Sequence, residues 1–117
     1  MVIIRFPSGV DWFRPNWVYR QFAADMTMEF PQNHDLEKIL EWGEAFGALY
    51  LDSLPTDTAA AIMEAMTKVA DETAQGKILG WKKTRPDDKA GHDMYLSSIA
   101  ELLSLLRKEQ SQRNGQV

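Results

Sequence analysis

The chain contains no cysteine, and this absence excludes several kinds of chemistry at once. Disulfide bridges, zinc sites built from thiolates and cysteine nucleophiles all need that side chain. The sequence also lacks an uninterrupted apolar run of about 18 residues, the length that a membrane-spanning helix needs. The opening segment, Met1–Pro7, holds only a short apolar run that ends in proline, unlike a secretory signal peptide. We therefore expect a cytoplasmic protein that does not enter a membrane.

Catalytic and cofactor-binding motifs are missing as well. The two histidines, His34 and His92, belong to neither an H-E-x-x-H nor an E-x-x-H pattern, so no metal site is predicted. No serine stands in a G-x-S-x-G setting, and the glycines form neither a phosphate-binding loop nor a dinucleotide fingerprint. The sequence thus predicts no catalytic residue, no metal ligand and no cofactor, which favours a binding protein over an enzyme.

Length and composition indicate one small globular unit. The 117 residues are enough to bury an ordinary core, and 44% hydrophobic with 26% charged residues is typical of folded proteins. We expect a single helical domain over residues 1–109. The polar residues 110–117 are expected to form a disordered C-terminal tail.

Positive charge is scarce in the middle of the chain. Residues 31–76 hold nine acidic residues against two lysines, a net charge of −7, whereas residues 77–117 hold eight basic against five acidic residues, a net of +3. The whole chain carries −4. Nucleic-acid binding needs an excess of Lys and Arg on the binding face, so direct binding to DNA or RNA is not favoured. A negative field instead speeds the encounter with a basic protein, which is the partner that this pattern predicts.

Helical periodicity dominates the apolar pattern. The expected helices span residues 15–28, residue 33 or 34 to about 52, residues 56–76 and residues 92–108. Residues 77–91 contain two glycines and a proline and are expected to form a loop. These elements predict an all-α fold, a small four-helix bundle with an extended, aromatic-rich N-terminal segment. The alternative is an α+β fold in which Val2–Phe6 and Ile78–Lys82 pair as two short strands.

Aromatic residues concentrate near the N-terminus, where seven of the twelve lie within the first thirty residues. Side chains of this size bury large areas and are seldom left exposed in such numbers. We therefore predict an N-terminal arm that contributes to the core. The alternative is that Trp12 or Trp17 lies on a binding surface.

Two glycines lie on the apolar side of the second expected helix. Gly43 and Gly47 are four residues apart, among apolar positions that include Leu36, Ile39, Leu40, Phe46 and Tyr50. Each glycine costs about 1 kcal/mol of helix propensity. The pair therefore predicts that another helix approaches closely at this point.

The same helix has one acidic side. At 100° per residue, Glu37, Glu41, Glu44 and Asp52 fall within an arc of about 80° that no lysine interrupts. Trp42 and Leu49 lie along one edge of this arc. Carboxylates that steer approach, next to an aromatic anchor, are typical of a docking face. The predicted partner-binding residues are therefore Glu37, Glu41, Trp42, Glu44, Leu49 and Asp52. The alternative is a solvated face with Trp42 packed against a neighbouring helix.

Two short segments suggest other functions. Glu41-Trp42-Gly43-Glu44 resembles the first E-x-x-E half of the all-α nucleoside triphosphate pyrophosphohydrolases, which bind magnesium through carboxylates on adjacent helices. The second half, E-x-x-D, is missing, because Glu64 is followed three residues later by Thr67. The segment Trp81–Arg85 combines an aromatic with three bases and could clamp single-stranded nucleic acid, although Asp87–Asp88 follow at once. A magnesium enzyme and a small nucleic-acid-associated regulator therefore stay open as alternatives.

The whole profile, a compact, cysteine-free, acidic domain without a catalytic motif, resembles bacterial immunity proteins, including those of contact-dependent growth inhibition systems. That resemblance implies a protein that binds one toxin domain, often a basic nuclease, and blocks its active site or its substrate surface. It assigns no individual residues, because it is a resemblance of profile and not of motif. The residues expected to bind come from the helical arc alone.

Overall fold

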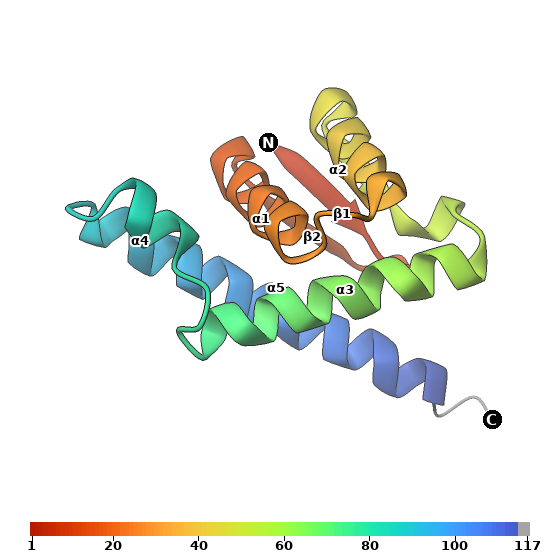
Figure 1. The fold of residues 1–117 in the computed structure, drawn as a ribbon. Helices are drawn as coiled ribbons and strands as arrows, with labels where there is room; N and C mark the ends of the chain where they lie inside the picture. The colour runs from red at the N-terminus through yellow and green to blue at the C-terminus, as the bar shows by residue number, and fades with distance from the viewer. Residues whose placement is uncertain (115–117) are drawn as a thin grey trace.

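The computed structural model describes the backbone of residues 1–114 and the side chains of residues 1–112. These residues form a mostly helical structure with one small sheet (Figure 1). The elements are β1 (Val2–Arg5), β2 (Asp11–Arg14), α1 (Asn16–Glu29), α2 (His34–Phe46), β3 (Ala48–Tyr50), the 3-10 turn η1 (Leu51–Ser53), α3 (Thr56–Ala74), α4 (Gly80–Thr84) and α5 (Lys89–Asn114).

The sheet has the strand order β2–β1–β3. The central strand β1 runs antiparallel to β2 and parallel to β3. A tight turn joins β1 to β2, and Gly9 adopts there the left-handed φ of 90° that glycine tolerates without strain. Alternate side chains point to opposite faces, so Ile4 and Trp12 are fully buried while Phe13 is 51% exposed.

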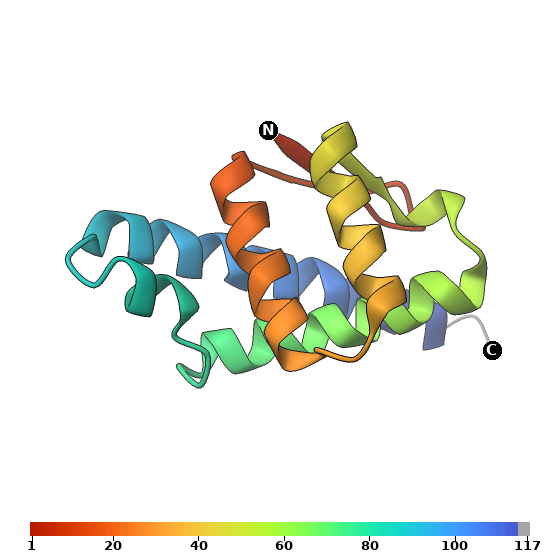
Figure 2. The ribbon, with the colours of Figure 1, turned by 45° about the horizontal axis from the view of Figure 1, so that its top comes forward.

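The helices cover the buried face of the sheet. α1 and α2 lie next to each other in front of the strands, and α3 and α5 run along the lower side of the molecule (Figures 1 and 2). α5 is attached to β2, because the indole N–H of Trp12 donates to the Ser98 carbonyl at 3.1 Å and Arg14 donates to the Ser98 hydroxyl at 3.2 Å. Buried apolar residues from strands and helices form one continuous core.

The predicted predominance of helices is confirmed, but the all-α four-helix bundle is not, and the α+β alternative fits the mixture of helices and strands. β1 coincides with the proposed strand Val2–Phe6, but its partners are β2 and β3, which the apolar pattern did not indicate. The proposed strand Ile78–Lys82 is not formed, since Gly80–Thr84 is the short helix α4. Three- and four-residue strands are too short to show a clear alternation against the stronger helical signal.

The second helix is shorter than expected, and this removes two predicted site residues from it. α2 ends at Phe46 because Gly47 takes a left-handed conformation, φ 72°, which terminates a helix. Leu49 therefore lies in β3, 6% exposed, and belongs to the core instead of the partner-binding surface. Asp52 is exposed, but it lies in η1 and not on the acidic side of α2.

The last helix is longer than predicted at both ends. α5 starts at Lys89, where an Asp88 carboxylate accepts the Gly91 N–H at 2.9 Å, and continues to Asn114. Residues 110–114 are thus helical and not a disordered tail, whereas residues 115–117 lie outside the described part of the chain.

The N-terminal aromatics contribute to the core as predicted. Trp12, Tyr19 and Phe22 are fully buried. Trp12 is therefore not a surface residue, and the alternative role suggested for it is wrong. Trp17 is half-buried against Trp81, with ring centroids 4.7 Å apart.

Candidate partner-binding surface

The geometry of α2 follows from its two ends. Asn33 caps the start of the helix, because its side-chain oxygen accepts the Leu36 N–H at 3.1 Å. Asp35 and Glu37 stand in the first turn, where the helix dipole favours negative charge. Over its 13 residues α2 buries Leu36, Leu40 and Gly43. The rest of its circumference carries polar and aromatic side chains that are wholly or partly exposed.

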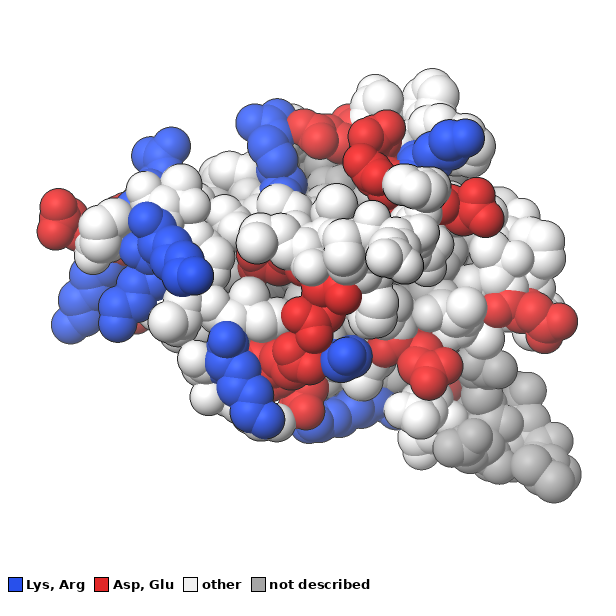
Figure 3. Space-filling model, in the orientation of Figure 1, with Lys and Arg blue, Asp and Glu red and all other residues white. Residues whose placement is uncertain are grey.

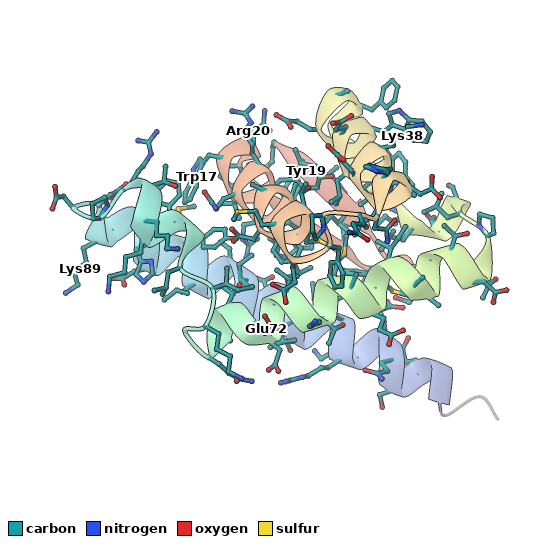
Figure 4. The ribbon with its side chains drawn as sticks, viewed as in Figure 1. Trp17, Tyr19, Arg20, Lys38, Glu72 and Lys89 are labelled. Carbon is teal, nitrogen blue, oxygen red and sulfur yellow. The ribbon has the colours of Figure 1, made fainter. Side chains whose placement is uncertain are left out.

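The flank of α2 nearest α1 is acidic. Glu44 accepts a hydrogen bond from Arg20 of α1 at 2.6 Å, and Glu37 lies 3.7 Å from His34. Arg20 is labelled on α1 in Figure 4. Glu41 is exposed and forms no ion pair with any described side chain. Three of the four predicted acids therefore share one flank, and Glu37 and Glu41 are not paired with a Lys or Arg among the residues described.

The opposite flank of α2 is aromatic. Trp42 is 58% exposed and Phe46 is 80% exposed, four residues apart and so one above the other on the helix. Lys38 stands one turn before Trp42 (Figure 4). The sequence pattern placed Phe46 among the apolar positions of the longer predicted helix, so its exposure on the surface was not predicted. The i, i+4 aromatic pair is the signal that could have identified it.

Asp52 lies near the sheet instead. The pKa of the Arg5 guanidinium is raised by its hydrogen bond and ion pair with Asp11, N–O 2.8 Å, and to a much smaller extent by Asp52. Asp52 contributes negative charge to this end of the molecule but is not part of the α2 surface.

Charge is unevenly distributed over the face shown in Figure 3. Acidic side chains gather over α2 and α3, and basic side chains gather over α4 and the start of α5 at the other end. Residues 82–90, which include Lys82, Lys83, Arg85 and Lys89, are all exposed. The basic side chains of α4 and the start of α5 thus lie apart from the acidic side chains of α2, along a molecule 46 Å long, whereas Arg107 farther along α5 pairs with Asp71 of α3 at 3.2 Å.

A second polar cluster is enclosed between α1, α4 and α5. Asp25 is only 4% exposed, and its carboxylate accepts hydrogen bonds from the Tyr95 hydroxyl and from the Gln21 amide, each at 3.0 Å. Burial raises the pKa of Asp25 although both hydrogen bonds oppose the shift, and burial also raises the pKa of Tyr95. α4 covers the cluster at Gly80, where an added Cβ would clash with the Asp25 carboxylate. We interpret Asp25 as a structural carboxylate.

Asp25→Asn is expected to stabilise the fold at neutral pH by on the order of 1 kcal/mol, because a neutral amide costs less to desolvate than a charged carboxylate. Because the pKa of Asp25 is raised in the folded state, the protonated carboxyl contributes fully to folding stability below pH 3.8, the ordinary pKa of an Asp side chain. This contribution is lost as the pH rises through the pKa of Asp25 in the folded state. The stability difference between variant and wild type should therefore be small in acid and grow with pH.

Urea unfolding from about pH 3.5 to pH 8 measures this difference. The exposed Asp93→Asn serves as the control for simple loss of one negative charge. A pH-independent effect, or one that matches the control, would contradict the assignment.

Among the described residues, no group of three or more His, Asp or Glu side chains is placed to hold a metal ion. Within residues 1–114, no helix combines the length and the apolar character that crossing a membrane requires. Comparisons with models of protein families, with curated proteins and with solved structures gave no match. The case for a binding surface therefore rests on the geometry of α2 and its neighbours alone.

Proposed function

We propose that the protein is a non-catalytic, cytoplasmic binding protein of the immunity type, which neutralises a basic cytotoxic domain. One observation carries this proposal: α2 exposes the aromatic pair Trp42 and Phe46 on a helix that also presents Glu37 and Glu41 to solvent. Interface energy concentrates in aromatic side chains that become buried, whereas charges of one sign set the rate of encounter. α2 offers both kinds of side chain on one rigid element.

A nuclease domain is the partner that fits this chemistry. Such an enzyme holds phosphates with Lys and Arg side chains, and carboxylates form charge-assisted hydrogen bonds with the same groups. Glu37 and Glu41 would pair with these Lys and Arg side chains in place of the phosphates. The bound protein would then occlude the active site or the substrate surface. The net charge of −4 supports the attraction to a basic surface at long range.

The function is tested by capture and by growth. The tagged protein is used to capture its partner from the source organism, and the captured protein is then expressed alone. We expect a basic protein that arrests growth and whose toxicity is relieved by co-expression of this chain. Capture of a partner that is harmless when expressed alone would reject the immunity function.

Glu37→Lys combined with Glu41→Lys is expected to slow association with the captured partner about tenfold at low salt, because it reverses the charge that steers the encounter. Glu44 is left unchanged, since it pairs with Arg20 and its reversal would disturb the contact between α1 and α2. Stopped-flow association rates at about 20 and 300 mM salt measure the effect, which should nearly vanish at the higher concentration.

The matched control is Glu64→Lys combined with Asp93→Lys, which makes the same change of net charge on α3 and α5. Both residues are exposed. Equal slowing by the two double variants would show that total charge, and not the acidic flank of α2, steers the encounter.

A further inference from the structure

A groove with a volume of about 320 Å³ runs between the start of α2 and α3. Figure 2 shows these two helices converging at this point. Apolar and small side chains line the groove: Leu36 and Ile39 from α2, and Thr58, Ala61, Ile62 and Ala65 from α3. The small side chains of α3 leave room for another backbone to approach.

The charges at the rim of this groove have one sign. Asp35 and Asp57 both line it, both are exposed, and neither forms an ion pair with a described side chain. No Lys or Arg is among its lining residues. A second groove, of about 490 Å³ between α3 and α5, is lined by Glu64 and by Lys68, which also lies 3.5 Å from Glu29. Charge complementarity therefore selects the α2–α3 groove, and not the larger one, for a basic ligand.

The apolar surface continues beyond the groove along α2. Ile39, Trp42 and Phe46 follow each other at i, i+3 and i+7, so they share one flank and extend over about 10 Å of helix. Trp42 and Phe46 are mostly exposed. A straight apolar strip of this length, with the carboxylates of Asp35 and Asp57 at its groove end, matches the apolar face of an amphipathic helix that carries basic side chains where it enters the groove. Because both walls are helices, a third helix can pack with its ridges in the groove between them.

From these observations we infer that the α2–α3 groove receives one amphipathic, basic helix of the partner. Its apolar side chains enter the groove between Ile39 and Ala61 and continue against Trp42 and Phe46, and its Lys or Arg side chains pair with Asp35 and Asp57. The inference rests on the proposed function in one respect, that the partner is a basic protein.

The groove is tested with a synthetic probe, without the natural partner. The probe is an amphipathic peptide of about 18 residues, long enough to form a helix on binding, with Leu on one face and Lys elsewhere. Titrated into the isotope-labelled protein, it should shift the amide signals of Ile39, Ala61 and Ala65 and the indole signal of Trp42. A peptide with the same Leu pattern and Glu in place of Lys should leave these signals unchanged. Equal responses to both peptides, or shifts confined to Phe13 and the outer face of the sheet, would overturn the inference.

Three variants of the protein provide a second test. Ala61→Leu fills the groove and should weaken binding of the Lys peptide at least about tenfold, whereas Ala60→Leu, the same change in the α3–α5 groove, should alter it less than about twofold. Asp35→Lys combined with Asp57→Lys should also weaken binding at least about tenfold, most strongly at low salt. An Ala61→Leu protein that binds the peptide normally would refute the placement.

The outcomes separate this inference from the proposed function. If the Lys peptide occupies the groove but capture yields no toxic protein, the inference holds and the immunity function fails. If growth protection is observed while the groove signals of the labelled protein stay unchanged with the captured partner, the function holds and the inference fails. Groove signals that shift with protein concentration, with no peptide present, would assign the groove to a second copy of this chain and overturn the inference.

Discussion

Gly43→Ala is expected to destabilise the fold by about 2 kcal/mol, even though alanine is the better helix former by about 1 kcal/mol. The reason is the approach of α1. A Cβ at position 43 would lie 3.0 Å from Cζ of Tyr19, closer still to its hydroxyl oxygen, and 3.3 Å from Cβ of Leu49. Tyr19 is fully buried and donates its hydroxyl hydrogen to the Leu40 carbonyl at 2.7 Å, so its ring cannot move aside without losing that bond.

Urea unfolding of Gly43→Ala, Tyr19→Phe and the double variant measures this contact as a double-mutant cycle. Removing the Tyr19 hydroxyl removes the closest clash, so the double variant should recover about 1 kcal/mol relative to the sum of the single effects. Ala45→Gly, on the exposed side of α2, measures how much alanine stabilises a helix relative to glycine. If Gly43→Ala stabilises the protein by that same amount, α1 does not approach α2 this closely.

The two glycines of the second predicted helix, Gly43 and Gly47, show what sequence reasoning can and cannot separate. Both fall on the apolar side, and both predict close packing at the same spacing. Gly43 does allow the ring of Tyr19 to approach, as expected. Gly47 has a different role, because its φ of 72° ends the helix and starts the chain into β3. Helical periodicity continues formally through Leu49 to Asp52, so the spacing alone could not show where the helix stops.

The helices were predictable because they are long and strongly periodic. α1 and α3 lie within two residues of their expected bounds, and Gly76 does end α3, with a φ of 77° and the Lys77 N–H bonded to the Glu72 carbonyl at 2.9 Å. The sheet was not predictable in the same way. Its strands gain their stability from pairing with residues distant in sequence, as Ile3 does with Phe13 and Ala48, and no local pattern reports such pairing.

The candidate surface was predictable to the extent that it lies within one helix. Glu37, Glu41 and Glu44 share a flank because helical geometry fixes their relative directions, and Trp42 is exposed as an anchor must be. The exposure of Phe46 depends on how the end of α2 stands relative to the rest of the molecule. The α2–α3 groove depends on the angle at which two helices meet, and no single segment contains that information.

Trp42→Ala combined with Phe46→Ala is expected to weaken binding of the captured partner by about 2 kcal/mol or more, which corresponds to a dissociation rate roughly thirtyfold faster. The association rate should change little, because steering depends on the carboxylates and they are unchanged. The fold should be preserved, since both side chains are mostly exposed and contribute little to the core. Surface-plasmon measurements of association and dissociation, with thermal unfolding as a check on stability, test the expectation.

Phe13→Ala provides the matched control, because Phe13 is also about half exposed but lies on the outer face of the sheet. If the sheet face were the interface, this variant would show the faster dissociation and the α2 variant would not. The aromatic variant and the charge-reversal variant should moreover act on different rate constants, the first on dissociation and the second on association. These separate effects follow from the geometry of α2, which places Glu37 and Glu41, neither paired with a described Lys or Arg, on one flank and the exposed rings on the other. Loss of association rate in both variants alike would mean that α2 acts only as a source of charge.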